Sequence, residues 1–264
     1  MKFGTKIWSK NKESFPKILE LYKKAILDFV EIYIVPGSDP KEADILKNLP
    51  IIFHAPNFHH KFNVRKQDQV FKNSLKTIKR FSEYFNEKRI VVHPGISKTE
   101  EKLEDSIPGI KKIKEAGMDI LIENMPKIGI DEKKTLYGST REEIKSIMTE
   151  IDCNFCLDVG HAICSANFHK KDPIEFINEF IRLKPIEVHI SDGDFDSIID
   201  QHKSIEEGNY PFDEIIPFIK NIEYITIETD KKDDYINLEE DKKNLIKLKQ
   251  LFSKYRLYKS CFFF

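Results

Sequence analysis

Short runs rich in Ile, Val and Phe recur roughly every 25 to 40 residues along the chain. The eight runs are Lys2 to Trp8, Phe29 to Ile34, Ile51 to Pro56, Arg89 to Pro94, Asp119 to Met125, Asn154 to Val159, Glu187 to Ser191 and Tyr224 to Thr229. Their length and their β-branched content are typical of parallel strands that are buried on both faces. The pattern therefore predicts eight buried strands.

Amphipathic segments separate most of these runs. One helical stripe consists of Phe15, Ile18, Leu19, Tyr22 and Ala25, and another consists of Phe71, Leu75, Ile78, Phe81 and Phe85. Two helix starts are also marked, because Thr140 and Glu143 have the spacing of a capping box and Asp172 precedes Pro173. The segments predict helices that alternate with the strands.

Eight strand-then-helix units without a linker predict a single-domain (β/α)8 TIM barrel over residues 1–264, with 253–264 as a possible tail. At 264 residues, with 40% hydrophobic side chains, the chain is long enough for one such barrel. The second unit is the weakest, because only Asp39 to Asn48 is available for its helix. A six-unit or doubly wound sheet is the alternative.

Side chains that bind metals occur at the carboxyl ends of the apolar runs or just beyond them. They are His54, His93, Glu123, Asp158, His161, His189, Asp200, His202 and Glu228. Side chains alternate along a strand, so His54 shares a face with Ile52, and Glu123 shares one with Leu121. We expect most of these groups to be the last inward-pointing residues of their strands.

A single histidine or carboxylate at a strand end is commonly a hydrogen-bonded core residue or a helix cap. Many such groups buried together would leave unpaired charges, at a cost of roughly several kcal/mol per ion. Divalent cations remove that cost. Mixed imidazole and carboxylate ligands favour Zn²⁺, with Mn²⁺ or Fe²⁺ as substitutes. Nine ligands exceed one tetrahedral ion, and Glu123 can bridge two, so the sequence predicts a metal cluster of the kind that hydrolyses phosphate esters.

Composition limits the partners. The formal net charge is -1, so any nucleic-acid contact must depend on a local patch or on metal ions. The four cysteines form no disulfide framework, and Cys153 and Cys156 are expected in the core rather than as a redox pair. We expect a cytoplasmic monomer with no membrane-spanning segment.

Seven motifs together resemble endonuclease IV, the second family of apurinic/apyrimidinic endonucleases, in order over nearly the whole chain. They are His54-Ala55-Pro56, His93-Pro94-Gly95, Glu123-Asn124, Leu157-Asp158-Val159-Gly160-His161, Val188-His189-Ile190-Ser191-Asp192, Asp200-Gln201-His202 with Glu207-Gly208-Asn209, and Ile227-Glu228-Thr229. Several are shared with the wider xylose isomerase-like barrels. The pair Asp200 and His202, together with His161, is the more specific part.

The resemblance implies three zinc ions. The first would be held by His54, His93 and Glu123, the second by Glu123, Asp158, His189 and Glu228, and the third by His161, Asp200 and His202. It further implies a catalytic role for Glu123 as the shared ligand and cleavage of damaged double-stranded DNA 5′ of an abasic site.

The chain departs from that family at its DNA-recognition loops. Residues 35–41, after the second strand, are few and lack the arginine that the family carries there. Asn57 and Phe58 stand where the family has an aromatic pair, and Phe58 could act as a wedge between bases. Candidate contacts to nucleic acid are Asn57, Phe58, His59, His60, Lys61 and Arg65. A solvated helix face is an equally good explanation of the basic residues that follow, such as Lys66 and Lys72.

Two other functions stay open. A sugar isomerase or epimerase of the same superfamily needs one metal, held by Glu123, Asp158, His189 and Glu228, and a proton-shuttling residue. It would leave the other five ligands without a role, and so it ranks second. A metal-loaded scaffold that has lost turnover is the third possibility.

Overall fold

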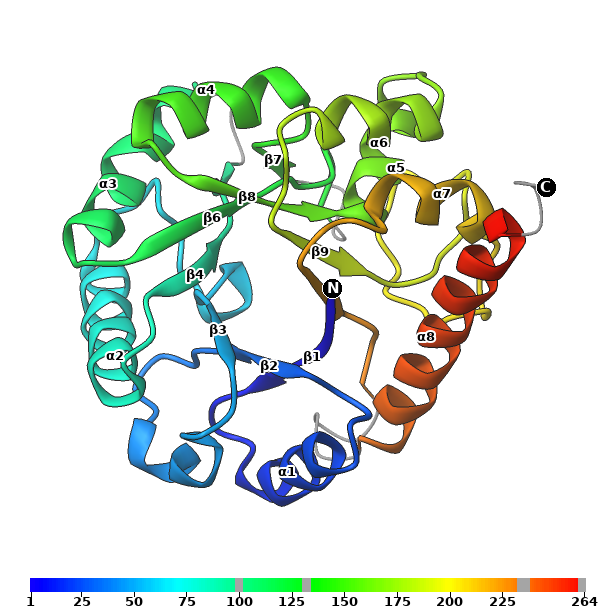
Figure 1. Cartoon of the computed structure of the whole chain (residues 1–264). Coiled ribbons are helices and arrows are strands. Elements are labelled where there is room, and N and C mark those ends of the chain that lie inside the picture. The colour runs from blue at the N-terminus through cyan, green and yellow to red at the C-terminus, as the bar shows by residue number, and fades with distance from the viewer. Residues whose placement is uncertain (98–101, 130–133, 232–237, 261–264) are drawn as a thin grey trace.

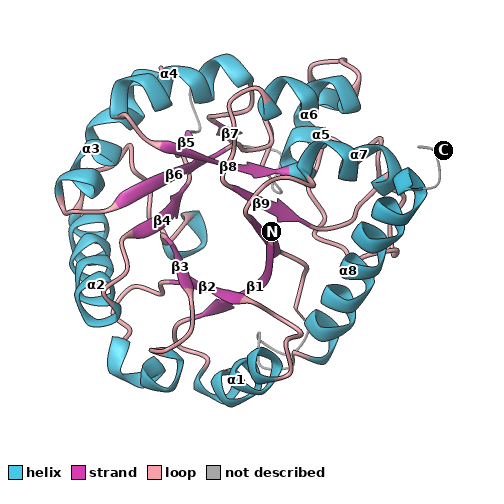
Figure 2. Cartoon of the chain, viewed as in Figure 1, coloured by secondary structure: helices cyan, strands magenta, loops and turns pink. Residues whose placement is uncertain are grey.

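The predicted barrel is confirmed. A computed structural model describes residues 1–97, 102–129, 134–231 and 238–260. Eight parallel strands close into a barrel in the order β1-β10-β9-β8-β6-β4-β3-β2. The strands lie at the centre of the molecule (Figure 2). The barrel strands are β1 (Lys2–Trp8), β2 (Phe29–Tyr33), β3 (Ile51–His54), β4 (Arg89–Val92), β6 (Asp119–Glu123), β8 (Asn154–Asp158), β9 (Glu187–Ile190) and β10 (Tyr224–Ile227). Closure excludes the doubly wound alternative.

Helices surround the barrel on its outside (Figure 1). The α-helices are α1 (Phe15–Lys23), α2 (Gln69–Phe85), α3 (Ile107–Glu115), α4 (Arg141–Ile151), α5 (Val159–Phe168), α6 (Pro173–Ile181), α7 (Phe212–Ile219) and α8 (Glu239–Ser260). The 3-10 helices are η1 (Lys12–Ser14), η2 (Pro40–Leu46), η3 (Phe58–His60) and η4 (Leu103–Ser106). The expected tail boundary at residue 253 falls within α8, and residues 261–264 lie outside the described part of the chain.

The predicted N-terminal caps of two helices are confirmed. Thr140 and Glu143 form a reciprocal capping box at α4, and the side chain of Asp172 accepts a hydrogen bond from Glu175 N at α6. In the weak second unit the chain forms only the 3-10 helix η2, which Asp39 caps. A short capped segment is thus enough to connect β2 to β3.

Two layers of apolar packing hold the barrel. Most of the core lies in one large cluster that includes Phe53, Phe155 and Phe180, and a smaller cluster contains Phe29, Leu121 and Cys156. Cys153 is half-buried and packs against the large cluster, so both cysteines contribute to packing as expected.

The loops after the strands form the mouth of the barrel. A short antiparallel pair, β5 (Ile96–Ser97) with β7 (Thr135–Leu136), joins the segment after β4 to the segment after β6. Among the described residues, no helix combines the length and the apolar composition needed to cross a membrane.

Candidate metal centre

The nine predicted ligands gather at the carboxyl ends of the strands. Within each of three groups, one ligand atom per residue lies within 4.8 Å of every other ligand atom in the group. The groups are His54, His93 and Glu123; Glu123, Asp158, His189 and Glu228; and His161, Asp200 and His202. These are the same three sets that the motif resemblance implies, and Glu123 belongs to two of them.

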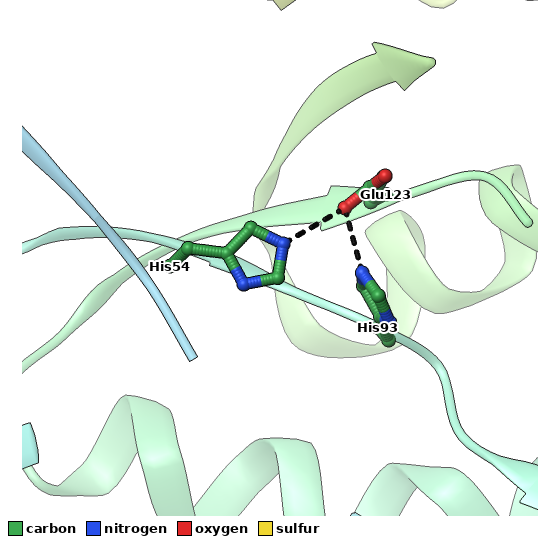
Figure 3. Close-up of side chains that lie close together, drawn as sticks. All are labelled: His54, His93 and Glu123. Carbon is green, nitrogen blue, oxygen red and sulfur yellow. Dashed lines mark hydrogen bonds and ion pairs between the residues drawn. The ribbon is translucent and has the colours of Figure 1, made fainter. Parts of the chain in front are cut away.

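In the first group, two imidazoles point at one carboxylate oxygen (Figure 3). Nε2 of His54 lies 3.3 Å from Oε2 of Glu123, and Nε2 of His93 lies 2.9 Å from the same oxygen. The Nδ1 atom of His54 lies 2.7 Å from the carbonyl of Ala55, which can only accept, so the proton resides on Nδ1. The Nε2 atom of His54 is thereby the ring nitrogen that faces Glu123. Burial lowers the pKa of His93 to about 4, so the His93 ring is neutral.

The second group surrounds His189. Its Nδ1 lies 2.7 Å from Oε2 of Glu228 and 3.4 Å from Oε1 of Glu123, and its Nε2 lies 2.8 Å from Oε2 of Glu31. A carboxylate behind the ring is the arrangement that orients a metal-binding histidine and increases its basicity. Burial raises the pKa of Asp158 to about 6, and the nearby Asp200 and Glu123 act in the same direction. His161 opposes this rise.

The third group lies in the loop after β9 and at the start of α5. Oδ2 of Asp200 lies 2.5 Å from Nε2 of His202 and 3.4 Å from Nε2 of His161. Both rings place Nδ1 against a backbone carbonyl, His161 at 2.8 Å from Asn124 O and His202 at 2.7 Å from Glu228 O. The two Nε2 atoms are thereby aimed at Asp200. Although burial acts in the opposite direction, nearby carboxylates raise the pKa of His161 to about 9 and that of His202 to about 10.

The donor set fits divalent cations. Several buried atoms of the ligand residues make no hydrogen bond among the described residues, including Glu123 Oε1, His189 Nδ1, Asp200 Oδ1 and Glu228 Oε2, although His189 Nδ1 lies within ion-pair distance of both glutamates. Buried polar atoms without partners are rare in native proteins and require an explanation. A cation between them would satisfy the lone pairs of nitrogen and oxygen together, and mixed imidazole and carboxylate donors suit Zn²⁺.

Two charged residues in the first two strands complete the centre and were not predicted from the sequence. Nζ of Lys6 lies 2.6 Å from Glu228 Oε1 and 3.4 Å from Glu31 Oε1. Burial opposes the charged forms, but Glu228 and Glu31 raise the pKa of Lys6, and His189 and Lys6 hold the pKa of Glu31 at about 2. One feature of the sequence could have identified Lys6 and Glu31. Each is a charged residue inside an apolar run, two positions before the strand-end residue and therefore on the same face.

A cavity of about 250 Å³ opens above the cluster. Its lining includes the ligand residues His93, His161, Asp200, His202 and Glu228. The rings of Trp8, Tyr33 and Phe58 line the same cavity. The ligand groups are thus accessible from this cavity, and a molecule bound there could contact both kinds of side chain.

The expected nucleic-acid contacts divide according to their position. Asn57, Phe58 and His59 line the cavity. His60 lies beside them, with Nδ1 2.8 Å from the hydroxyl of Tyr33, and Lys61 is exposed at the end of η3.

Arg65 requires a correction. Its side chain is 2% exposed, donates to Lys102 O, Ser106 Oγ and Asp105 Oδ2, and lies 4.1 Å from the ring centroid of Tyr137. The guanidinium is therefore engaged inside the protein and has no face left for a phosphate. It fastens the loop before α2 to η4 instead.

Comparison with known proteins is consistent with the barrel. The sequence profile described as "xylose isomerase-like TIM barrel" matches residues 41–251. An uncharacterized protein of Methanocaldococcus jannaschii is 26% identical over 249 residues, covering 85% of this chain and 81% of that protein.

Solved structures of two different enzyme classes are similar to the chain to the same degree. A D-tagatose 3-epimerase-like protein has a TM-score of 0.72 and 23% identity, covering 98% of this chain and 99% of its own. Endonuclease IV from Thermus thermophilus also has a TM-score of 0.72, with 20% identity, covering 96% of this chain and 100% of its own. At these identities the similarity establishes the fold alone.

Proposed function

We propose that the chain, which belongs to the xylose isomerase-like TIM barrel family whose profile matches residues 41–251, is a zinc-dependent phosphodiesterase. It would cleave DNA 5′ of abasic sites. The observation that carries the proposal is the third ligand group, His161, Asp200 and His202, beside the other two. A single-metal enzyme would have no use for it. Three groups can hold three Zn²⁺ ions, with Mn²⁺ or Fe²⁺ as substitutes.

When bound, the ions would supply a nucleophile at neutral pH and polarise the phosphoryl oxygens. The protein's part is to place the ligands. Glu123 joins the first and second groups, because its Oε2 faces His54 and His93 while its Oε1 faces His189. We assign Glu123 the central catalytic position for this reason.

Residues behind the ligands fix their protonation and orientation. Backbone carbonyls bind Nδ1 of His54, His161 and His202, so each ring presents Nε2 to its group. Asp158 also accepts a hydrogen bond from His161 N at 2.7 Å, which couples the second group to the start of α5. The rings consequently need little reorganisation when a cation enters.

In this proposal the partner is damaged double-stranded DNA, and the protein acts as a cytoplasmic monomer. Asn57, Phe58 and His59 would contact the lesion from the wall of the cavity, with His60 and Lys61 next to them. The similarity to a solved endonuclease IV is compatible with this function but does not select it over epimerisation.

A single-metal sugar isomerase or epimerase is the second candidate. The cavity of about 250 Å³ beside the second group would hold a small ligand, and one structural neighbour is an epimerase-like protein. Lys6, the cation beside that group, has a raised pKa and keeps its proton, so it is a poor base for abstracting a proton from a sugar carbon.

The test is nicking of an abasic duplex. Zinc-loaded protein should cut a labelled duplex that contains one tetrahydrofuran residue and should leave a 3′-hydroxyl that a polymerase extends. Chelator should abolish the cleavage, and zinc should restore it. Protein that carries three ions per chain and leaves the abasic duplex intact would contradict the proposal.

A further inference from the structure

We propose that Lys6 donates a hydrogen bond to a phosphoryl oxygen of the substrate and is thereby a catalytic residue beside the metal ligands. The inference rests on the proposed function and adds a fixed positive charge to its site. It depends on how the ammonium group of Lys6 is held between two carboxylates and on the cavity that its side chain lines.

The register of the barrel strands places Lys6 between the two carboxylates. Lys6 lies on β1, and its register partner on β2 is Glu31. On the other side of β1, Thr5 pairs with Ile227, which directly precedes Glu228. Nζ of Lys6 accordingly lies 3.4 Å from Glu31 Oε1 and 2.6 Å from Glu228 Oε1. The ammonium group is thus held by the segments on both sides of β1.

These two contacts leave the ammonium group of Lys6 one donor. A lysine ammonium has three N–H donors, and within the residues that the structure describes Nζ contacts Glu31 and Glu228. Lys6 also lines the cavity, although its side chain is only 9% exposed. A molecule in the cavity can therefore contact Lys6, and the third donor is the group that Lys6 offers it. Because bulk water is largely excluded here, the charge acts strongly.

Lys6 also determines what Glu228 offers to the second ligand group. Oε1 of Glu228 contacts Lys6, whereas Oε2 lies 2.7 Å from His189 Nδ1. Oε2 is thus the oxygen that faces the group, and Glu228 can give a cation there one oxygen rather than two. A catalytic metal site needs a position that protein ligands leave open. Lys6 helps to keep such a position for the substrate, next to its own charge.

The charge of Lys6 suits a phosphate ester. In phosphoryl transfer the transition state carries negative charge on its equatorial oxygens, and a cationic side chain beside them stabilises that charge. Lys6 supplies such a group without a further metal ion. A sugar without a phosphate has no charge of this kind, so Lys6 favours a phosphate ester over an unphosphorylated sugar.

Removing this charge should have opposite effects on the binding of zinc and of phosphate. In Lys6→Met, Glu31 and Glu228 lose their cationic partner, so zinc should bind at least about tenfold more tightly, measured by competition with a chromophoric chelator. Inorganic phosphate should bind zinc-loaded Lys6→Met at least about tenfold more weakly, measured by calorimetry, because a charge-assisted hydrogen bond is lost. A folding defect would instead weaken both. Weaker binding of both, or unchanged phosphate binding, would overturn the inference.

Two further variants separate the role of Lys6 from general effects. Lys6→Gln keeps a hydrogen-bond donor without the charge, and it should change the two affinities in the same opposite directions if the methionine variant does not fold. Lys10→Met is the matched control, because Lys10 is exposed two residues after β1 and its Nζ lies 4.9 Å from the ring centroid of Trp8. This variant should change either affinity by less than about twofold, since solvent screens the charge. Equal effects in Lys6→Met and Lys10→Met would overturn the inference.

The two proposals fail separately. Phosphate binding that Lys6→Met weakens, in a zinc-loaded protein that leaves an abasic duplex intact, would keep the phosphate contact of Lys6 and reject the abasic-site phosphodiesterase. Cleavage of the abasic duplex with the same kcat and KM in Lys6→Met and in the unaltered protein would keep the phosphodiesterase and reject the role of Lys6.

Discussion

Nε2 of His189 lies 2.8 Å from Oε2 of Glu31, and both side chains are completely buried. The contact leaves Nδ1 of the same ring facing Glu228 and Glu123. Glu31 therefore orients a ligand from β2 without belonging to any ligand group.

Replacing that carboxylate should loosen the second metal site. We expect Glu31→Gln to lower zinc affinity about 10- to 100-fold, because an amide orients the ring but no longer increases its basicity. Competition with a chromophoric chelator measures the change. Glu20→Gln is the matched control, because Glu20 lies on α1 and its side chain is 43% exposed. Equal zinc affinity in Glu31→Gln and Glu20→Gln would show that Glu31 has no such role.

Removing one ligand of the third group should affect that group alone. His202→Ala should bind one zinc ion fewer and should cleave abasic DNA at least about a hundredfold more slowly, because the third group would lose an ion that stabilises charge in the reaction. The fold should persist, since His202 lies in a loop outside the barrel strands. His169→Ala is the control, because that histidine lies at the end of α5 and outside the ligand groups. Full activity in His202→Ala would remove the third ion from the mechanism.

As pH rises, the metal-free protein should lose stability, whereas the stability added by zinc binding should increase. In the metal-free protein the pKa values of His161 and His202 rise to about 9 and about 10 from the 6.5 of an unfolded histidine. The stability that they contribute is complete below pH 6.5 and is lost as pH rises towards 9 and 10. Zinc must displace the same protons, so its binding strengthens over this range.

Melting temperatures of chelated and zinc-loaded protein between pH 6.5 and 9 measure this effect. The difference between the two forms should widen as pH rises. Chelated His202→Ala should lose less stability over the same range than the chelated unaltered protein. A difference that narrows with pH would contradict the protonation states assigned to these histidines.

The apolar packing inside the barrel should govern the stability of the whole centre. Leu121 is completely buried on β6, two residues before Glu123. Leu121→Ala should lower the free energy of unfolding by about 2–5 kcal/mol, measured by urea denaturation of the metal-free protein. Ile246→Ala, at a position that is 40% exposed on α8, should change it by less than about 1 kcal/mol. Similar losses in the two variants would contradict the assigned packing.

Much of this architecture could be read from the sequence, because its signals are local. The eight apolar runs match the eight barrel strands to within about two residues at each end. Alternation along those strands placed His54, Glu123 and His189 on the inner face, where the structure has them. Closure of the barrel then brought the ligands together without further information.

The roles of Arg65, Lys6 and Glu31 were not predicted, and the physical cause is the same for all three. Their roles depend on contacts with residues that are distant in the sequence. Arg65 is surrounded by cationic residues in the sequence, yet it pairs with Asp105, 40 residues away. Lys6 and Glu31 lie inside runs otherwise suited to a core. Their burial is explained by their pairing with Glu228, directly after β10, and with His189, on β9. No local pattern predicts such partners.

The number of metal ions per chain tests the central claim most directly. Protein purified without chelator, or reloaded with zinc and desalted, should carry close to three ions by elemental analysis against a protein concentration from amino-acid analysis. A value close to one would contradict the trinuclear centre and favour a single-metal isomerase or epimerase. A value close to zero after reloading would contradict metal binding at the cluster altogether.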